Sequence, residues 1–234
     1  MKRLVAALAF LTRVPISTAF TAEDVGHASI FFPVIGVGIG ALQLGLWKLA
    51  SPHLTSLVVA VLVVTLSAWL TRALHLDGLA DFVDGLGGGR TREDVLRIMK
   101  DSRIGAFGAI ALVLVLGTKI AAVDAIVSPE AFLLAPALSR WTPVVLAYSL
   151  PYARSNTSLP GPAAYVGKLE LGVATFITAG LVGLLGHAVL AGVVVLVSVL
   201  VGVIAKRRIG GVTGDVLGAN IELAEAAVLV VATI

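Results

Sequence analysis

Three aspartates between residues 75 and 84 have the spacing expected of a helix that binds metal and phosphate. Asp77, Asp81 and Asp84 stand at positions i, i+4 and i+7, so on an α-helix they fall within roughly 60° of one face. Like charges at this spacing repel one another. A cation among them would relieve the repulsion, and oxygen ligands alone favour Mg²⁺ or Mn²⁺ over zinc. A solvated helix kept out of the bilayer by its aspartates is the alternative interpretation.

The glycines around these aspartates leave room for a ligand. Gly78 and Gly85 each follow an aspartate directly, and the missing side chain lets a ligand or a neighbouring backbone approach closely. Three successive glycines at 87–89 predict a break in the helix. The loop at that break could wrap a phosphate, although a plain linker would have the same sequence.

A row of basic residues follows the glycines. Thr91, with Asp94 three residues later, predicts the start of a short helix. On it Arg97, Lys100 and Arg103 recur at i, i+3 and i+6. This row could neutralise substrate phosphates beside a metal site, or it could meet anionic lipid headgroups.

A second charged cluster lies near the end of the chain. Asp215 and Glu222 fall on one helical face, in a segment that is otherwise apolar enough for a membrane span. Ionisable groups in such a segment are costly and usually functional. We expect both to contact substrate or metal, although Asp215 could instead cap the last helix. Arg207 and Arg208 precede this segment and could bind phosphate, or they could mark a cytoplasmic helix end.

Four further charges have open interpretations. Asp101 could complete a metal shell or pair with a neighbouring arginine. Asp124 could pair with Lys119 or lie at the outer membrane interface, and Arg140 could face a polar cavity or a buried carboxylate. His75, two residues before the first aspartate of the carboxylate helix, is a candidate proton acceptor.

The elements that carry these residues are predicted to be membrane helices. The chain of 234 residues is 58% hydrophobic and only 13% charged, which excludes a soluble globule. Its apolar runs are apolar all round, which favours helices over a barrel. There is no cysteine, which excludes a disulfide scaffold or a thiolate metal centre.

We predict an all-α, polytopic membrane bundle that forms a single domain over residues 1–234. Residues 2–16 have the pattern of a short amphipathic helix on the membrane surface, stopped by Pro15. A tight turn at Gly186-His187 should divide the last long apolar run. About seven stretches are long enough to cross the bilayer: residues 30–50, 54–74, 104–127, 131–150, 169–186, 188–205 and 215–234.

Lysine and arginine accumulate on alternate connections between these spans. The connections around Pro52, Pro129 and Gly186 contain no lysine or arginine, whereas the segments around 90–103 and 206–208 are rich in them. The positive-inside rule therefore places the amino terminus and the charged segments in the cytoplasm. The same rule explains the formal net charge of +3 without nucleic-acid binding.

Five sequence motifs resemble the cobalamin-5′-phosphate synthase family. They are FLTRVP, FFPVIG, HLDGLADFVDGLGGG, IMKDSRIGAFG and GGVTGDVLGAN, which occur in this order and are distributed over nearly the whole chain. Several long motifs in series are far more specific than a single glycine motif.

The resemblance implies an enzyme of a prokaryotic inner membrane, with its active site on the cytoplasmic side. Its expected activity joins adenosylcobinamide-GDP to α-ribazole, or to the 5′-phosphate of α-ribazole, with release of GMP and a requirement for Mg²⁺. Asp77, Asp81 and Asp84 would then bind the metal, with His75 or one of these aspartates as the proton acceptor. The sequence is compatible with a homo-oligomer. A cation transporter and a structural membrane subunit are the alternatives from other classes.

Overall fold

The computed structural model describes residues 1–154 and 161–234 of the chain. The described residues form helices, with a single isolated bridge between Tyr152 and Val212 outside them. The elements in chain order are α1 (Lys2–Leu11), α2 (Ala22–Ala28), η1 (Ser29–Phe31), α3 (Phe32–Ala50), α4 (Ser56–Leu70), α5 (Leu74–Gly88), α6 (Arg92–Ile98), α7 (Ala106–Asp124), α8 (Ala131–Ser149), η2 (Pro162–Tyr165), α9 (Lys168–Leu185), α10 (Ala188–Ile209) and α11 (Gly214–Val231).

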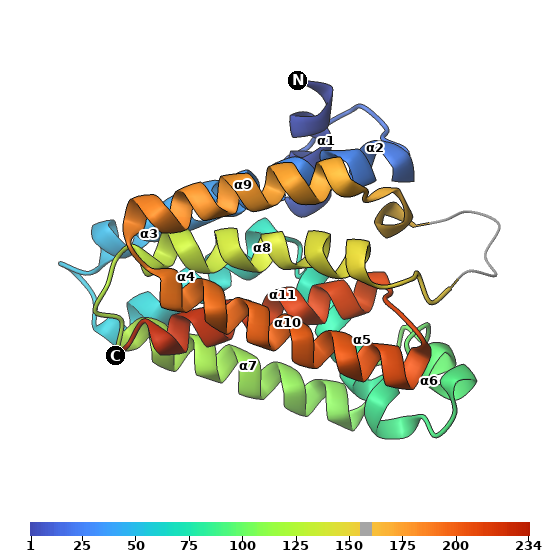
Figure 1. Cartoon of the computed structure of the whole chain (residues 1–234). Helices are drawn as coiled ribbons and strands as arrows, with labels where there is room; N and C mark the ends of the chain where they lie inside the picture. Colours follow the sequence, from blue (N-terminus) through green and yellow to red (C-terminus); the bar gives the residue numbers. More distant parts are fainter. Residues whose placement is uncertain (155–160) are drawn as a thin grey trace.

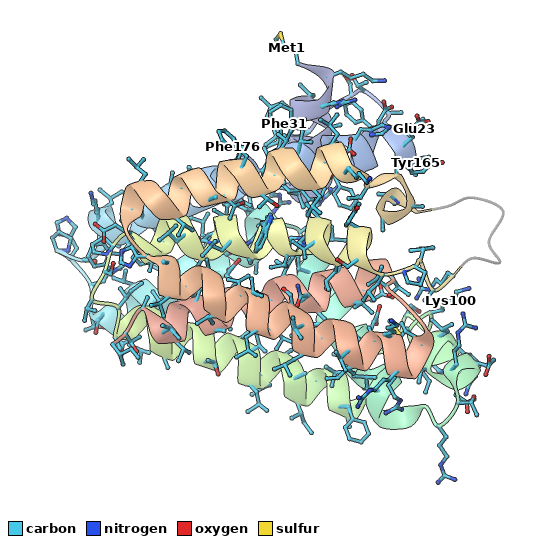
Figure 2. The ribbon with its side chains drawn as sticks, in the orientation of Figure 1. Met1, Glu23, Phe31, Lys100, Tyr165 and Phe176 are labelled. Atoms are coloured by element: carbon cyan, nitrogen blue, oxygen red, sulfur yellow. The ribbon has the colours of Figure 1, made fainter. Side chains whose placement is uncertain are left out.

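This arrangement confirms an all-α membrane bundle. Among the described residues, five helical segments are long and apolar enough to cross a membrane, and the bent pair α4–α5 can supply a sixth. The segment 215–234, predicted as a further span, forms α11, which carries three acidic residues. The outer faces of the bundle carry many exposed apolar side chains, as a lipid-facing surface requires. Phe176 on α9 is one of them (Figure 2).

The centre of the bundle is formed by α8 and α11 (Figure 1). α8 is the most buried of the candidate spans, and α3 lies directly against it. The close approach depends on Gly36 and Gly40 of α3, since a Cβ atom at either position would clash with the α8 backbone at Pro136 or Phe132. Small residues four positions apart are the usual means by which membrane helices pack at short distance.

Two predicted boundaries can be compared directly with the structure. The turn between α9 and α10 falls at Gly186, which has a φ of 76° and ends α9 in the left-handed conformation, as predicted. The amino-terminal helix ends at Leu11, earlier than the predicted stop at Pro15. The Thr12 hydroxyl donates to the Leu8 carbonyl, and the next residue, Arg13, already bonds to another helix.

The two ends of the bundle differ in charge. Figure 1 shows the C-terminus at the end where α9 turns into α10, and α6 at the opposite end. Lys100 projects at the α6 end (Figure 2). Lys48, in the last turn of α3, is an exception at the end that is otherwise poor in basic residues. Lys206, Arg207 and Arg208, in the last turn of α10, lie at the α6 end.

The predicted span 54–74 ends earlier in the structure, and a sharp break separates it from the next helix. α4 ends at Leu70, and α5 leaves it at an angle of 88°. Arg72 and Ala73 at the break have φ values of 55° and 54°, a left-handed conformation that is unfavourable for residues other than glycine. The segment after α1 holds the break, because Arg13 N–H donates to the Leu70 carbonyl at 2.7 Å and its guanidinium lies 4.0 Å from the Trp69 ring centroid. The break sets the direction of α5, the helix that carries the predicted carboxylates.

Candidate active site

The carboxylates of α5 and α11 are brought together by a close helix crossing. A Cβ atom on Gly78 of α5 would lie 3.0 Å from the Cα of Asp215, and one on Gly218 of α11 would lie 3.3 Å from the Cα of His75. Both glycines therefore permit the backbones to approach. The crossing places Asp215 beside the turn of α5 that carries Asp77, so two clusters far apart in the sequence meet at one site.

Asp81 lies among these charges. It interacts electrostatically with Asp77, Asp215 and Asp84, and with the guanidinium of Arg154. Arg154 donates to the carboxylate of Asp215 at 2.8 Å. Arg154 is not among the site residues predicted from the sequence, because its place soon after the predicted span 131–150 was the only signal available.

Asp215 lies in the first turn of α11 but does not cap it. Thr213 is the N-cap residue, and its hydroxyl accepts from the Val216 N–H. The same hydroxyl lies 3.3 Å from the Asp215 carboxylate. The alternative in which Asp215 caps the helix is therefore wrong, and its carboxylate is directed to Arg154 and to the site.

Asp84 has a structural task at the start of α7. Its two carboxylate oxygens accept from the backbone N–H groups of Gly105 at 2.7 Å and Gly108 at 2.8 Å. A carboxylate at a helix N-terminus satisfies amides that have no partner within the helix. Asp84 thus holds α5 against α7 through these two hydrogen bonds. This structural role is independent of the metal contact that the sequence predicts for Asp84. Asp77 is exposed and Asp81 half-buried, so both are more accessible than Asp84.

The end of α5 is fastened by Arg208. α5 continues to Gly88 rather than breaking at the first of the three glycines, and its last residues are followed directly by α6. The Arg208 guanidinium donates to the carbonyls of Leu86 at 3.2 Å and Gly89 at 2.7 Å. This cation stabilises the carboxyl-terminal end of a helix, a structural role beside the predicted contact with phosphate. Arg207 is exposed on the last turn of α10.

An open basic groove lies beside the carboxylates. Its volume is about 440 Å³, and it includes Arg97 and Lys100 of the predicted basic row together with Arg154. Arg92 also lines it and donates to the carbonyls of Ile209 and Ala153 at 2.9 and 2.8 Å, which joins α6 to α10. The full lining is Arg92, Glu93, Leu96, Arg97, Lys100, Ala153 and Arg154.

Arg103 does not belong to this lining. It donates to both carboxylate oxygens of Asp101 at 2.9 and 2.6 Å, which confirms the pairing alternative for Asp101. The hydrogen bonds from Arg103 lower the pKa of the Asp101 carboxyl to about 2. Asp94 accepts a hydrogen bond from Arg97, one turn later, at 3.3 Å. This bond together with those from Thr91 lowers the pKa of the Asp94 carboxyl.

A second hollow, which we call the apolar cavity, opens on the other side of Asp215. Its volume is about 300 Å³, and its walls come from α1, α2, η1, α3, α5, α8, η2 and α11. Most lining side chains are apolar, including Phe10, Phe32 and Val144, and Asp77 and Asp215 also line it. Arg154 and Asp215 therefore lie between the basic groove and the apolar cavity.

His75 lines the apolar cavity. Its side chain is 3% exposed, and its Nδ1 atom has no hydrogen-bond partner among the described residues. A buried polar atom without a partner is costly and is typical of a ligand or proton-transfer site. The structure thus places the candidate proton acceptor next to the carboxylates.

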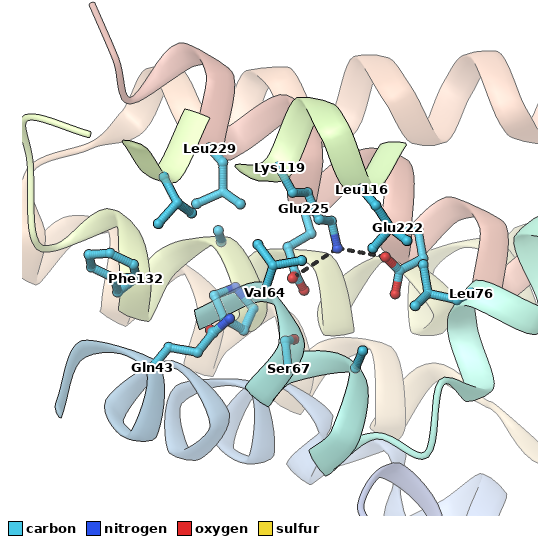
Figure 3. A pocket seen from close by; sticks show the side chains of 14 residues that line it. Gln43, Val64, Ser67, Leu76, Leu116, Lys119, Phe132, Glu222, Glu225 and Leu229 are labelled. Atoms are coloured by element: carbon cyan, nitrogen blue, oxygen red, sulfur yellow. Dashed lines mark hydrogen bonds and ion pairs between the residues drawn. The ribbon is translucent and has the colours of Figure 1, made fainter. Parts of the chain in front are cut away.

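Glu222 lies apart from this site, in a buried ion network at the middle of the bundle. Lys119 Nζ bonds to Glu222 at 2.6 Å and to Glu225 at 3.0 Å (Figure 3). Glu225 also accepts from Arg140 and from Ser139. The structure therefore confirms the buried carboxylate as the partner of Arg140 and separates Glu222 from Asp215.

The pairing proposed between Lys119 and Asp124 is wrong. The Lys119 ammonium is buried between two glutamates of α11, whereas Asp124 is exposed at the end of α7. The network borders a cavity of only about 10 Å³, about the space for one water molecule.

The described residues contain no group of three or more acidic or histidine side chains arranged to hold a metal ion. Mg²⁺ does not require one, because it is usually bound by one or two carboxylates, several waters and the phosphates of a substrate. Asp77 and Asp81 are hard oxygen donors one helical turn apart, and Asp215 lies across from them. This donor set fits Mg²⁺ or Mn²⁺ held together with a phosphate.

Fold and site together define a multi-pass helical membrane protein with a carboxylate and arginine site at one end of the bundle. The family model described as "Cobalamin-5-phosphate synthase" matches residues 3–233. The chain belongs to this family, whose members are enzymes of cobalamin synthesis.

Relatives named adenosylcobinamide-GDP ribazoletransferase are similar over almost their whole length. The protein of Syntrophobacter fumaroxidans is 39% identical over 95% of this chain and 94% of its own. Those of Chlorobium chlorochromatii and Sinorhizobium medicae are 40% and 39% identical, over 96% and 95% of this chain and 93% and 92% of their own. No solved structure matches the chain.

Proposed function

We propose that this chain transfers the phosphocobinamide group of adenosylcobinamide-GDP to α-ribazole or to its 5′-phosphate. The ribazole 3′-hydroxyl oxygen forms a bond to the phosphorus next to cobinamide. The bond from that phosphorus to the bridging pyrophosphate oxygen breaks, and GMP leaves with that oxygen. The hydroxyl proton goes to a protein base, and the product is adenosylcobalamin or its 5′-phosphate.

The observation that carries the proposal is that Arg154, which lines the basic groove, bonds to Asp215 at 2.8 Å, and that Asp215 lines the apolar cavity together with Asp77. A pyrophosphate needs cationic side chains around it, and the groove offers Arg97, Lys100 and, at its boundary, Arg154. The acceptor hydroxyl needs a base within reach of the same phosphorus. His75 and the aspartates lie on the other side of Arg154, so the two reacting groups can meet at Asp215.

Mg²⁺ or Mn²⁺ held by Asp77 and Asp81 would neutralise the charge that develops on the phosphoryl oxygens. The protein residues contribute binding and orientation. Arg154 is oriented by its bond to Asp215 at 2.8 Å, and its side chain lines the groove in which the phosphates would bind. Asp84 fixes α5 relative to α7, so the aspartates of α5 keep their position when the substrates bind.

We place this site on the cytoplasmic side of a prokaryotic inner membrane. The support is the positive-inside rule, because α6 with its basic row lies at the end of the bundle opposite the C-terminus (Figure 1). Accessibility labelling of single cysteines at Lys100 and at Asp124 tests this placement. Cytoplasmic reagents should modify the first, and periplasmic reagents the second.

An isosteric substitution tests the activity itself. Membranes with Asp77→Asn should release GMP at least about 100-fold more slowly than wild type at saturating Mg²⁺, because a carboxylate that stabilises transition-state charge is lost. Asp124→Asn is the matched control, since Asp124 is an exposed aspartate at the other end of the bundle. Near-normal GMP release by Asp77→Asn would contradict the assignment, and absence of acceptor-dependent GMP release by wild type would contradict the function.

A further inference from the structure

The apolar cavity contains two buried polar atoms that the protein leaves without partners. Ser29 is 2% exposed and His75 is 3% exposed. Among the described residues, Ser29 Oγ and His75 Nδ1 have no hydrogen-bond partner, although both residues line this cavity. Each unmade hydrogen bond costs free energy, so their presence in one cavity points to a ligand that supplies the missing partners.

The chemistry of the cavity restricts that ligand. Apolar side chains dominate, among them Phe10, Phe32, Val144 and Ile221, and no lysine or arginine occurs among the described residues that line it. Phosphate groups therefore bind elsewhere. A flat aromatic group with few polar atoms fits such walls, because burial of apolar surface is favourable and each buried polar atom needs a partner.

Size excludes the corrinoid part of the donor. A cavity of about 300 Å³ is at the lower limit for ligand pockets, and a corrin ring with its amide side chains is several times larger than such a pocket holds. Three aromatic groups remain in the proposed reaction: the guanine of the donor, the adenine of its adenosyl group, and the base of the acceptor. Both purines carry polar groups along most of their edges, which this lining would leave largely unpaired.

We propose that the apolar cavity binds the aromatic base of the α-ribazole acceptor, with the Ser29 hydroxyl donating to its unsubstituted ring nitrogen. A benzimidazole linked to ribose has only one such nitrogen, so one donor satisfies it. His75 Nδ1 is then available to the ribose, beside Asp77. This inference rests on the proposed function. It assigns the acceptor to the apolar cavity on one side of Arg154 and the donor nucleotide to the basic groove on the other side.

A substitution that fills the cavity tests the proposal. Ala147 of α8 lines the cavity, and two residues before it Val145 lines a separate groove with Trp141 and Lys206. Initial rates of the full-length protein in membranes should show that Ala147→Phe raises the KM for α-ribazole at least about 10-fold. The KM for adenosylcobinamide-GDP should change less than about twofold, and Val145→Phe should change neither KM by more than about twofold.

A second variant removes the proposed hydrogen bond without filling space. Ser29→Ala should raise the KM for α-ribazole about fivefold, with the donor KM unchanged. If Ala147→Phe does not accumulate in membranes, Ala163→Leu in η2 fills the same cavity and replaces it. A rise in the donor KM alone, or an unchanged acceptor KM in both the Ser29→Ala and the cavity-filling variants, would overturn the assignment.

Binding without turnover separates this inference from the proposed function. Equilibrium dialysis should show α-ribazole binding to wild type in the absence of donor, at least about 10-fold weaker binding to Ala147→Phe, and no competition by guanosine. If wild type released no GMP, the proposed function would fail, but this binding pattern would still support the cavity assignment. Equal binding by wild type and Ala147→Phe, or displacement by guanosine, would overturn it.

Discussion

Two groups of charged side chains in this bundle have opposite characters. In the buried ion network, Lys119 and Arg140 are matched by Glu222 and Glu225, and the adjoining cavity has space for about one water molecule. At the α6 end, Asp81 interacts electrostatically with the carboxylates of Asp77, Asp84 and Asp215 and with the guanidinium of Arg154. This site adjoins two hollows of about 300 and 440 Å³. Charge inside a membrane bundle therefore does not by itself indicate catalysis.

The two groups differ in whether protein side chains alone neutralise the charges. A closed, balanced network holds helices in register, whereas an excess of carboxylates beside open space needs a cation or a substrate to complete it. The buried ion network joins α7, α8 and α11, and the last of these helices also carries Asp215 into the site. On this account the network positions the helices that the active site uses.

The largest expected effect is a loss of stability when one carboxylate of the buried ion network is neutralised. Glu225→Gln leaves the buried guanidinium of Arg140 without its carboxylate, and it should lower the free energy of unfolding by about 3 kcal/mol. Denaturation in mixed micelles measures the change. Glu23→Gln, at an exposed residue of α2, is the control and should have little effect. Equal stability of Glu225→Gln and wild type would contradict a structural role.

A smaller effect, on donor binding, is expected from a substitution at Arg154, which lies at the boundary between the two hollows. Arg154→Gln removes a charged donor beside the phosphate groove and should raise the KM for adenosylcobinamide-GDP about 10-fold. Arg103→Gln changes a basic residue of the same end that is paired with Asp101 outside the groove, so its donor KM should stay within about twofold of wild type. Steady-state rates of GMP release compare the two variants, and equal KM changes would contradict the distinction between them.

The smallest effect is expected at Asp101. Its pKa is lowered to about 2 by Arg103, so the carboxylate stays ionised until the pH falls toward that value, and its contribution is lost only in acid. Asp101→Asn should therefore leave the pH-rate profile unchanged between about pH 5 and 8. A shift of the profile, or a raised requirement for Mg²⁺, would show that Asp101 belongs to the site.

The sequence predicts the helices well because long apolar runs with clear turn residues such as Gly186 determine them locally. It does not predict the sharp break between α4 and α5, since Arg72 and Ala73 are not residues that normally adopt a left-handed conformation. Tertiary contacts, including the bond from Arg13 to Leu70, impose that conformation.

The site could be predicted only in part, because tertiary contacts between residues far apart in the sequence also determine it. The spacing of Asp77, Asp81 and Asp84 indicates one helical face, and all three do lie on α5. The bond of Asp84 to Gly108 and that of Glu222 to Lys119 join positions 24 and 103 residues apart. No local pattern encodes such contacts, so sequence reasoning placed Glu222 with Asp215 and overlooked Arg154.

One measurement compares the two charged groups directly: the turnover number per folded molecule at saturating substrates and Mg²⁺. The double variant Lys119→Met/Glu222→Gln removes one charge of each sign from the network and leaves Arg140 paired, so it should keep at least about a tenth of wild-type turnover. Asp81→Asn removes one negative charge from the site and should lose at least about 100-fold. Near-normal turnover by Asp81→Asn, or an equal loss in the double variant, would contradict the account.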